Sequence, residues 1–321
     1  MQNNNHGTRT IRMKSGTSTL LARLDDNDLF WNFRHSPLVI LAASLTLLVV
    51  VCSLAAPLVA PHDPFDMASI NIMDSLLPPA WMKDGTSTFL LGTDDQGRDI
   101  LSTILYGSRI SILVGFASVA FAMVLGIFIG LVAGYWGGWL DALLTRIADV
   151  QLSFPAILIA LLIDGVARAA FGEQIGEDRT AFGVLILSIG LSFWVQYART
   201  VRGSVFVEKR KEYVQAAQVI GLPPSLIVYR HILRNVMSPV LVIATIQLAL
   251  AIITEATLSF LGVGVPPTSP SLGTLIRVGN DFLFSGQWWI TIFPGVALVL
   301  LVLSVNLLGD WLRDMLNPRL K

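Results

Sequence analysis

One acidic residue lies inside a long apolar stretch of this sequence. Glu255 falls in AIITEATLSFLG, residues 251–262, with Thr254 beside it and Ser259 one helical turn later. A carboxylate at membrane depth carries a large desolvation cost, so an intramembrane acid usually has a function. The alternative is that Glu255 hydrogen-bonds to a neighbouring helix or to nearby hydroxyls and only fixes packing. Both interpretations stay open from the sequence.

The other residues that could do chemistry form no recognisable site. The four histidines are scattered without metal-ligand spacing, and the one cysteine, Cys52, lies in an apolar run. No GxxxxGK[ST] phosphate loop is present, so any ATP must be bound by another polypeptide. An intramembrane enzyme would need a paired acid, a serine with a base, or a histidine-rich metal site. We therefore keep it as a remote alternative and expect no catalytic, cofactor-binding or metal-binding residues in this chain.

Composition indicates a membrane protein. Hydrophobic residues make up 54% of the 321 residues and charged residues 14%, while the zero net charge gives no basic field typical of nucleic-acid binding. At 1.5 Å per residue, about 20 apolar residues cross a hydrocarbon core of about 30 Å. We expect an all-α polytopic membrane protein with six transmembrane helices, at about residues 37–60, 108–134, 143–168, 180–197, 237–262 and 288–308.

The polar segments define the expected organisation. Residues 1–36 form a cytoplasmic tail with an interfacial helix at about residues 20–33, and residues 61–107 form an external, periplasmic loop. Residues 108–309 form the core with the other five helices, and residues 310–321 a second cytoplasmic tail. With both ends on one side, that side carries 16 of the 22 lysines and arginines, which satisfies the positive-inside rule.

Two local features should shape the spans. Gly126, Gly130 and Gly134 recur at four-residue intervals in the second span, a pattern that lets helices pack backbone to backbone. Pro155 is expected to kink the third span.

A polar insert between the fourth and fifth spans organises the rest. Read as a helix, residues 212–220 place Tyr213, Ala216, Ala217 and Ile220 on one face. Gly221 is a left-handed helix stop. Two prolines then suit the start of a second short helix at about residues 225–233. Its expected apolar side consists of Leu226, Tyr229 and Leu233.

The motifs in this insert, A-A-x-x-x-G at residues 216–221 and R-H-I-L-x-N at residues 230–235, resemble the cytoplasmic loop of bacterial ATP-binding-cassette importer permeases. Two positions depart from the family pattern: Gln215 stands where glutamate is usual, and Arg234 where proline is usual. The resemblance implies a coupling loop over residues 208–235 that docks into a groove on a separate ATPase subunit. Its contact residues would be Glu212, Tyr213, Gln215, Ala216, Ala217, Ile220 and Gly221. The alternative is an ordinary amphipathic helix lying on the membrane.

A second stretch is similar to the dipeptide, oligopeptide and nickel branch of these permeases. It comprises A-P-H-D-P at residues 60–64 and L-G-T-D-D-Q-G-R-D-I-L-S at residues 91–102. Asp94, Asp95, Arg98 and Asp99 either contact a substrate-carrying protein or hold their own loop together through charge pairs and turns.

The resemblance implies a type I importer permease subunit of the bacterial inner membrane, working by alternating access on dipeptides or oligopeptides. Nickel or another small solute is the alternative cargo. Implied partners are a second homologous permease, two ATPase subunits that bind ATP and Mg²⁺, and a periplasmic solute-binding protein. Thr254, Glu255 and Ser259 resemble the family's pore-lining fifth helix and would line the translocation path.

Overall fold

The computed structural model describes residues 35–66, 70–171, 178–266 and 268–316. The chain forms two compact units, residues 1–40 and residues 41–321. In the first, the structure describes only residues 35–40, at the start of one helix, so the predicted interfacial helix at residues 20–33 lies outside the described residues. The architecture below is that of the second unit.

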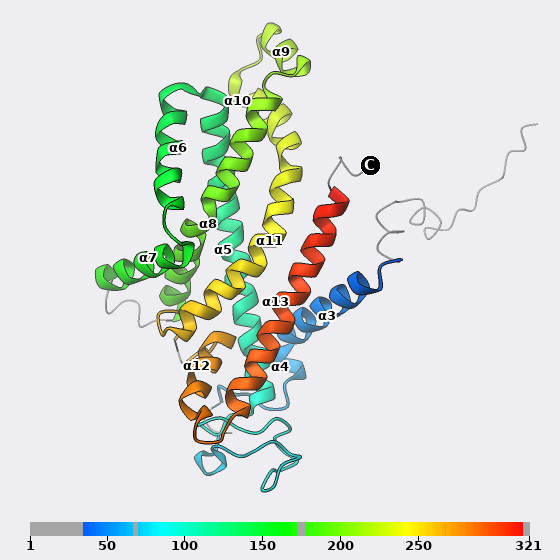
Figure 1. Cartoon of the computed structure of the whole chain (residues 1–321), viewed down its shortest axis with the longest axis vertical. Helices are drawn as coiled ribbons and strands as arrows, with labels where there is room; N and C mark the ends of the chain where they lie inside the picture. The colour runs from blue at the N-terminus through cyan, green and yellow to red at the C-terminus, as the bar shows by residue number, and fades with distance from the viewer. Residues whose placement is uncertain (1–34, 67–69, 172–177, 267, 317–321) are drawn as a thin grey trace, which may run out of the picture. The chain divides into compact units, whose positions relative to one another are not determined.

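The described residues form helices joined by turns, with one isolated bridge between Thr93 and Asp99. In chain order the α-helices and the short helical turns (η) are α3 (Pro37–Leu54), α4 (Ala56–Val59), η1 (Ile72–Asp74), α5 (Ile100–Trp136), α6 (Gly138–Leu152), α7 (Ala156–Phe171), α8 (Asp178–Glu208), α9 (Glu212–Val219), α10 (Pro224–Ile227), η3 (Val228–Ile232), α11 (Leu233–Phe260), α12 (Leu272–Leu283) and α13 (Trp289–Leu316). Figure 1 shows α9 at one end of the bundle made by α5, α8 and α11, and α12 toward the other end.

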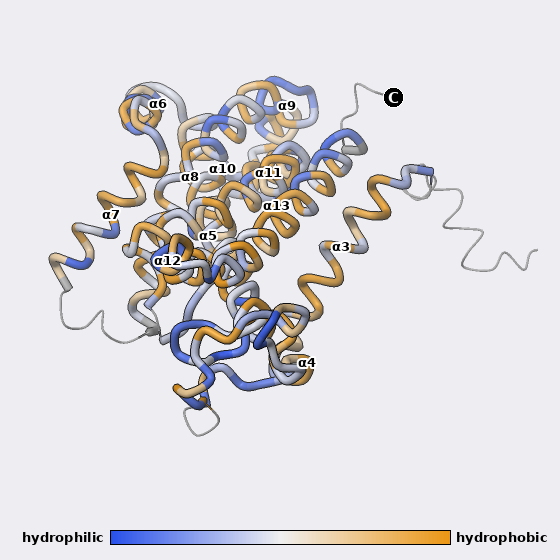
Figure 2. The backbone as a smooth tube through the Cα atoms, turned by 60° about the horizontal axis from the view of Figure 1, so that its bottom comes forward, coloured by the Kyte–Doolittle hydropathy of each residue, from blue (hydrophilic) through white to orange (hydrophobic). Residues whose placement is uncertain are grey.

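Five of these helices are long and apolar enough to cross a membrane, and the α6–α7 pair makes a sixth span if it is counted as one. Figure 2 shows the hydrophobic residues along these helices and the hydrophilic ones gathered mainly in the connections. The chain is therefore an all-α polytopic membrane protein. The predicted kink in the third span is a full break: α6 and α7 meet at 97° across residues 153–155, where Pro155 cannot continue the helix.

Three helices extend about two to three turns beyond the predicted spans. The helix α5 begins at Ile100 because the side chain of Asp99 caps it, so residues 100–107 are helical rather than part of the preceding loop. The helix α8 continues to Glu208 instead of ending near residue 197, and α13 runs to Leu316, through the start of the predicted tail. The prediction followed the apolar stretches alone, whereas the helices continue through the polar residues at their ends.

The predicted small-residue face forms the contact between α5 and α8, which we call the glycine seam: Gly126, Gly130 and Gly134. A Cβ atom built on Gly130 would lie 2.6 Å from the carbonyl oxygen of Ala198, and one on Gly134 would lie 2.7 Å from Cβ of Val205. No side chain fits at these positions, so glycine is what lets the two backbones touch.

Two large apolar clusters hold the helices together. The larger joins α5 and α8 to α9, α10 and most of the length of α11, and Tyr197 and Ile232 are fully buried in it. The smaller joins the start of α5 to α11, α12 and α13 around Leu272 and Leu301. The same two long helices, α5 and α11, contribute to both clusters and connect the two ends of the bundle.

Gly130→Ala should lower the stability of the folded chain by about 1–3 kcal/mol, because the new methyl group overlaps the α8 backbone. Thermal unfolding in detergent micelles measures this. Gly203→Ala is the matched control, since a Cβ on Gly203 of α8 meets nothing within 4 Å. Equal unfolding temperatures for the two variants would show that α5 and α8 can separate without cost.

Candidate functional site

The helix α9 lies in the segment 208–235 and presents one apolar face inward and another outward. Val214 and Ala217 are buried in the larger cluster, whereas Ala216 is exposed and Ile220 is 77% exposed. Tyr213 lies at the edge, 36% exposed. The prediction that Ala217 shares one outer face with the other three was therefore wrong, because Ala217 packs into the larger apolar cluster, which also contains residues of α10 and η3. The exposed residues are Glu212, Tyr213, Gln215, Ala216, Gln218 and Val219 of α9 and Ile220 directly after it.

Gly221 ends α9 as the sequence predicted. Its φ is +84°, a left-handed conformation that favours glycine, and a Cβ there would meet nothing within 4 Å. The N–H of Leu222 donates to the carbonyl of Ala217 at 3.1 Å, which satisfies one of the free carbonyls at the end of the helix. Backbone conformation, rather than space, therefore requires the glycine.

The second helix of the segment differs from the prediction. It begins at Pro224 and continues through one π-helical turn, η3, directly into α11. Its buried residues are Ile227, Val228 and Ile232, whereas Tyr229 is 74% exposed and Leu226 is 37% exposed. A π turn adds a residue to the helical turn, so the apolar face drawn with an ideal helical period was wrong here.

A polar network anchored on Tyr213 ties α9 to both flanking membrane helices. The hydroxyl of Tyr213 donates to Glu208, the last residue of α8, and accepts a hydrogen bond from Asn235 Nδ2 of α11 at 2.9 Å. Glu208 also pairs with Lys211 Nζ at 2.6 Å. Burial and then the bond to Glu208 raise the pKa of Tyr213, so its hydroxyl keeps the proton that it donates.

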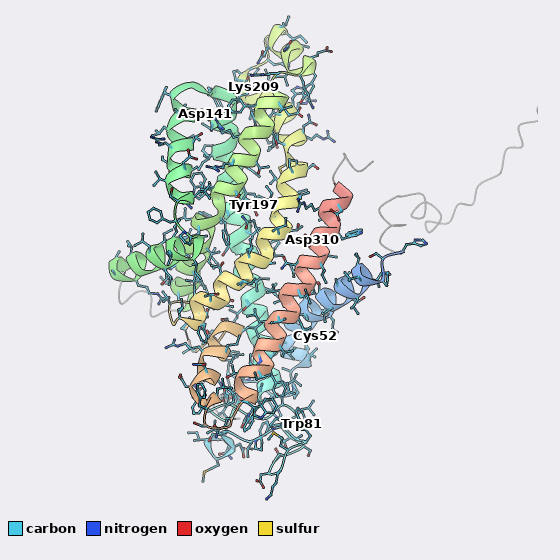
Figure 3. The ribbon with its side chains drawn as sticks, in the orientation of Figure 1. Cys52, Trp81, Asp141, Tyr197, Lys209 and Asp310 are labelled. Carbon is cyan, nitrogen blue, oxygen red and sulfur yellow. The ribbon has the colours of Figure 1, made fainter. Side chains whose placement is uncertain are left out.

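Ion pairs from α6 to α8 support the same end of the molecule, where Figure 3 labels Asp141 and Lys209. Arg202 of α8 donates from Nη2 to Asp141 Oδ2 at 2.8 Å, and Arg199 pairs with Asp149. Lys209 Nζ donates to the carbonyl of Gly134 at 3.0 Å. Sequence reasoning missed these pairs because their partners are about 50 to 75 positions apart.

Asp94, Arg98 and Asp99 are buried in the loop before α5. Arg98 Nε lies 2.7 Å from Asp94 Oδ2, while Asp94 Oδ1 accepts the N–H groups of Gln96 and Arg98, each at 2.9 Å. Asp99 Oδ2 accepts from the N–H of Ser102 at 2.9 Å and from its hydroxyl at 2.6 Å. These hydrogen bonds all join residues of the loop and of the first turn of α5. They favour the interpretation that the loop holds itself together over the one in which these residues contact a substrate-carrying protein.

Asp95 differs from its three acidic and basic neighbours. It is partly exposed, and burial followed by the charge of Asp94 raises its pKa. Gln96, beside it, is exposed. Of the four residues predicted to contact a carrier protein, Asp95 is the one whose placement leaves it accessible.

Glu255 lies in a closed polar cluster where α5, α11 and α12 meet. It is fully buried, and Ser259 Oγ donates to its Oε1 at 2.7 Å. The hydroxyls of Ser111 on α5 and Ser271, which caps α12, face the same carboxyl group. Ser259 Oγ also accepts from the N–H of Val265 at 3.3 Å. This surrounding fits the packing interpretation of Glu255 and Ser259.

Thr254 lies on a different side of α11. It lines a cavity of about 350 Å³ together with residues of α8 and of the α6–α7 break. Gln151, Ser192, Gln196 and Gln247 supply further polar groups to this cavity. The sequence signal for them, single glutamines at the ends or in the middle of apolar runs, was present but passed over because an amide carries no charge. Among the described residues, no cluster of three or more acidic, histidine or cysteine side chains could hold a metal ion.

Comparison with known proteins identifies the family of this chain. Residues 126–321 match the family described as binding-protein-dependent transport system inner membrane component. The chain belongs to this family. Residues 27–79 of the permease match a second family, the N-terminal TM domain of oligopeptide transport permease C. The permease is thus a multi-pass inner membrane transport subunit, not an enzyme.

Relatives resemble the permease over nearly its whole length. The di/tripeptide transport system permease protein DppC of Pseudomonas aeruginosa is 37% identical, covering 91% of this chain and 92% of the relative. The dipeptide permease DppC of Haemophilus influenzae is 36% identical, covering 91% and 94%. The probable D,D-dipeptide permease DdpC of Escherichia coli is 33% identical, covering 92% and 93%.

A solved structure shares the fold of the permease. It shows inward-facing conformations of the MetNI methionine ABC transporter and aligns with a TM-score of 0.52 at 18% identity. The alignment covers 68% of this chain and 98% of the other. The likeness supports the type I importer permease fold that the sequence predicted.

Glu255→Leu should destabilise the permease by about 1–3 kcal/mol, because Ser259 and its neighbouring hydroxyls lose a buried acceptor. Glu255→Gln keeps an acceptor and should cost less. Thermal unfolding in detergent measures the stability of the wild type, Glu255→Gln and Glu255→Leu, which should decrease in that order. If both variants unfold like the wild type while uptake is lost, the packing interpretation is wrong and the carboxyl serves the cargo.

Tyr213→Phe should loosen α9, because one hydroxyl supplies its hydrogen bonds to both α8 and α11. A loss of about 1 kcal/mol would speed amide hydrogen exchange in residues 214–219 about fivefold. Tyr229→Phe is the control, since Tyr229 is 74% exposed. Unchanged exchange in Tyr213→Phe would show that apolar burial of Val214 and Ala217 holds α9 alone.

Proposed function

We propose that this permease is the subunit through which short peptides cross the membrane in an ATP-driven, binding-protein-dependent importer. The observation that carries the proposal is its similarity, over 91% of its length, to permeases named for di- and tripeptide transport. Two further relatives carry dipeptide names, and the N-terminal match is to an oligopeptide permease family. The names of these relatives are what support short peptides as the cargo.

The proposed partner at α9 is an ATPase subunit. A short helix that exposes Ile220 and Ala216 beyond the end of α8 suits a groove on a second protein. Val219 is 88% exposed and adds to that surface. In this proposal ATP and Mg²⁺ bind on two such ATPase subunits, and a homologous second permease and a periplasmic solute-binding protein complete the assembly.

The proposed orientation puts α9 in the cytoplasm together with both chain ends. It follows from the distribution of charge, since that side receives 16 of the 22 lysines and arginines. The loop before α5 and the helix α12 then face the periplasm, and Asp95 and Gln96 lie on the surface open to a binding protein.

Transport in this proposal works by alternating access. Closure of the ATPase pair on ATP would draw the docked α9 helices of the two permeases together, and this motion would open the pathway toward the periplasm. Cargo delivery and ATP hydrolysis would return the inward-facing state. The contacts of α9 with α8 and α11 through Tyr213 give the displacement a route into the membrane helices.

Cells lacking this chain should lose uptake of labelled di- and oligopeptides and regain it when the wild-type chain is restored. A host without other peptide importers removes redundancy, and nickel uptake measured in parallel tests the alternative cargo. We expect peptide uptake to change at least tenfold and nickel uptake to stay constant.

Two results would contradict the proposal in different ways. Loss of nickel uptake with intact peptide uptake would keep the importer and replace the cargo. Peptide uptake that persists after Ile220→Asp, in a chain that still inserts into the membrane, would remove α9 from its docking role.

A further inference from the structure

A polar cavity lies beside the middle of the membrane helix α11. Gln247 stands midway along α11, which runs from Leu233 to Phe260. Its side chain lines the cavity of about 350 Å³ that also includes Thr254, one face of α8 and the α6–α7 break. If α11 spans the bilayer, Gln247 is about 20 Å from either end of the helix and hence near the midplane.

The amide of Gln247 is buried without a partner. Gln247 is 5% exposed, and its Oε1 makes no hydrogen bond within the described part of the chain. A buried amide left unpaired costs about 1–3 kcal/mol, and the cost is larger where the surroundings are apolar. Glu255, the buried acid of the same helix, differs in that one of its carboxyl oxygens accepts a hydrogen bond from Ser259 at 2.7 Å, while its Oε2 has no partner among the described residues.

The cavity offers further hydrogen-bonding groups but no charge. Gln196 makes no side-chain hydrogen bond among the described residues, and Thr254 Oγ1, which donates to Leu250 O at 2.8 Å, still has a free lone pair. Gln151 is already used, since its amide donates to Leu191 O at 2.6 Å and accepts from Trp194. No acidic or basic side chain lines the cavity.

This set of groups matches one kind of ligand. A side-chain amide carries a donor and an acceptor side by side, as a peptide group does, so Gln247 and Gln196 can each pair with backbone N–H and C=O. We propose that this cavity is a subsite that holds the backbone amide of a peptide in transit, with Gln247 as its principal contact. The proposal rests on peptide import as the function of the permease.

The break between α6 and α7 supports a ligand site at this place. Backbone without helical hydrogen bonds at membrane depth occurs only where protein covers it or where it lines a polar cavity. Here Leu152 and Phe154, on either side of Ser153, line the same cavity as Gln247. The 97° bend between α6 and α7 therefore contributes to the wall of the cavity.

The size and neutrality of the cavity suit cargo of varied sequence. A volume of about 350 Å³ lies at the lower end of the roughly 300–1,000 Å³ range of small-molecule sites, enough for a short backbone segment. Contacts to the backbone are shared by all peptides, and the absence of charged lining residues leaves cargo side chains of either sign unselected.

The test uses the complete transporter, with the binding protein and ATPase subunits, in proteoliposomes. Gln247→Leu should lower the maximal uptake rate of a tripeptide about fivefold, the loss of about one hydrogen bond, and Thr254→Val should lower it about twofold. Thr257→Val is the matched control: Thr257 makes the same bond to the carbonyl four residues earlier, at 2.7 Å, but does not line the cavity. Its uptake should equal that of the wild type.

A second arm asks whether the backbone amide is the recognised group. The wild type should carry a tripeptide better than its backbone N-methylated analogue, and Gln247→Leu should reduce this preference at least threefold. The same binding protein delivers both cargoes, so its own preference cancels when the two permeases are compared. An unchanged preference would overturn the proposal even if the uptake rate falls.

The remaining outcomes are also decisive. Wild-type rates in Gln247→Leu would overturn the subsite and leave peptide import intact, whereas a wild-type complex that carries no peptide would remove the proposed function itself. Failure of Gln247→Leu to co-purify with the second permease would make the cavity a subunit contact and likewise overturn the proposal.

Discussion

The close contact of α5 with α8 is the constraint from which the rest of the structure follows. Lipid gives helices no hydrophobic reason to associate, so two long spans stay together only where their backbones can approach closely. Gly130 and Gly134 provide that approach. The carbonyl of Gly134 then accepts a hydrogen bond from Lys209, the residue directly after α8. The glycine seam therefore extends to the end of α8, where Glu208 hydrogen-bonds to Tyr213 of α9.

Buried polar side chains in this fold differ in whether they have a hydrogen-bond partner within the protein. Asp94 and Arg98 satisfy each other inside a loop, and Glu255 accepts from Ser259 inside a helix junction. Each of these buried groups makes at least one side-chain hydrogen bond, although Oε2 of Glu255 has no partner among the described residues. Gln247 lacks a partner although it is as deeply buried. Unpaired buried polar groups are rare, and the side chain of Gln247 makes no hydrogen bond within the described part of the chain, which is the observation that the proposed subsite explains.

The sequence predicted the membrane helices, the short helix α9 and its glycine stop, since all three depend on local patterns of apolar residues and on one residue that tolerates positive φ. It failed where long-range packing decides. The inner face of an eight-residue helix is decided by what packs against it, and Ala217 turned inward into the apolar cluster that also contains Ile227 and Ile232. The face assigned to Tyr229 was wrong because a π turn shifts the register, and that turn has no sequence signature in an ideal helical count.

One continuous helix connects the parts of the proposed mechanism. The segment from Pro224 to Phe260 is a single candidate span that begins beside α9, carries Gln247 at its middle and ends at the Glu255 cluster. Pro239 lies between α9 and Gln247, and its missing N–H leaves the carbonyl of Asn235 without a helical partner. At the far end the carboxyl group of Glu255 faces hydroxyls of α5 and of the α12 cap, whereas the near end is joined to α9 through Asn235 and Tyr213. In the proposed mechanism a displacement of α9 would therefore act first on the turn that Pro239 weakens, and the polar cavity lies between that turn and the Glu255 cluster.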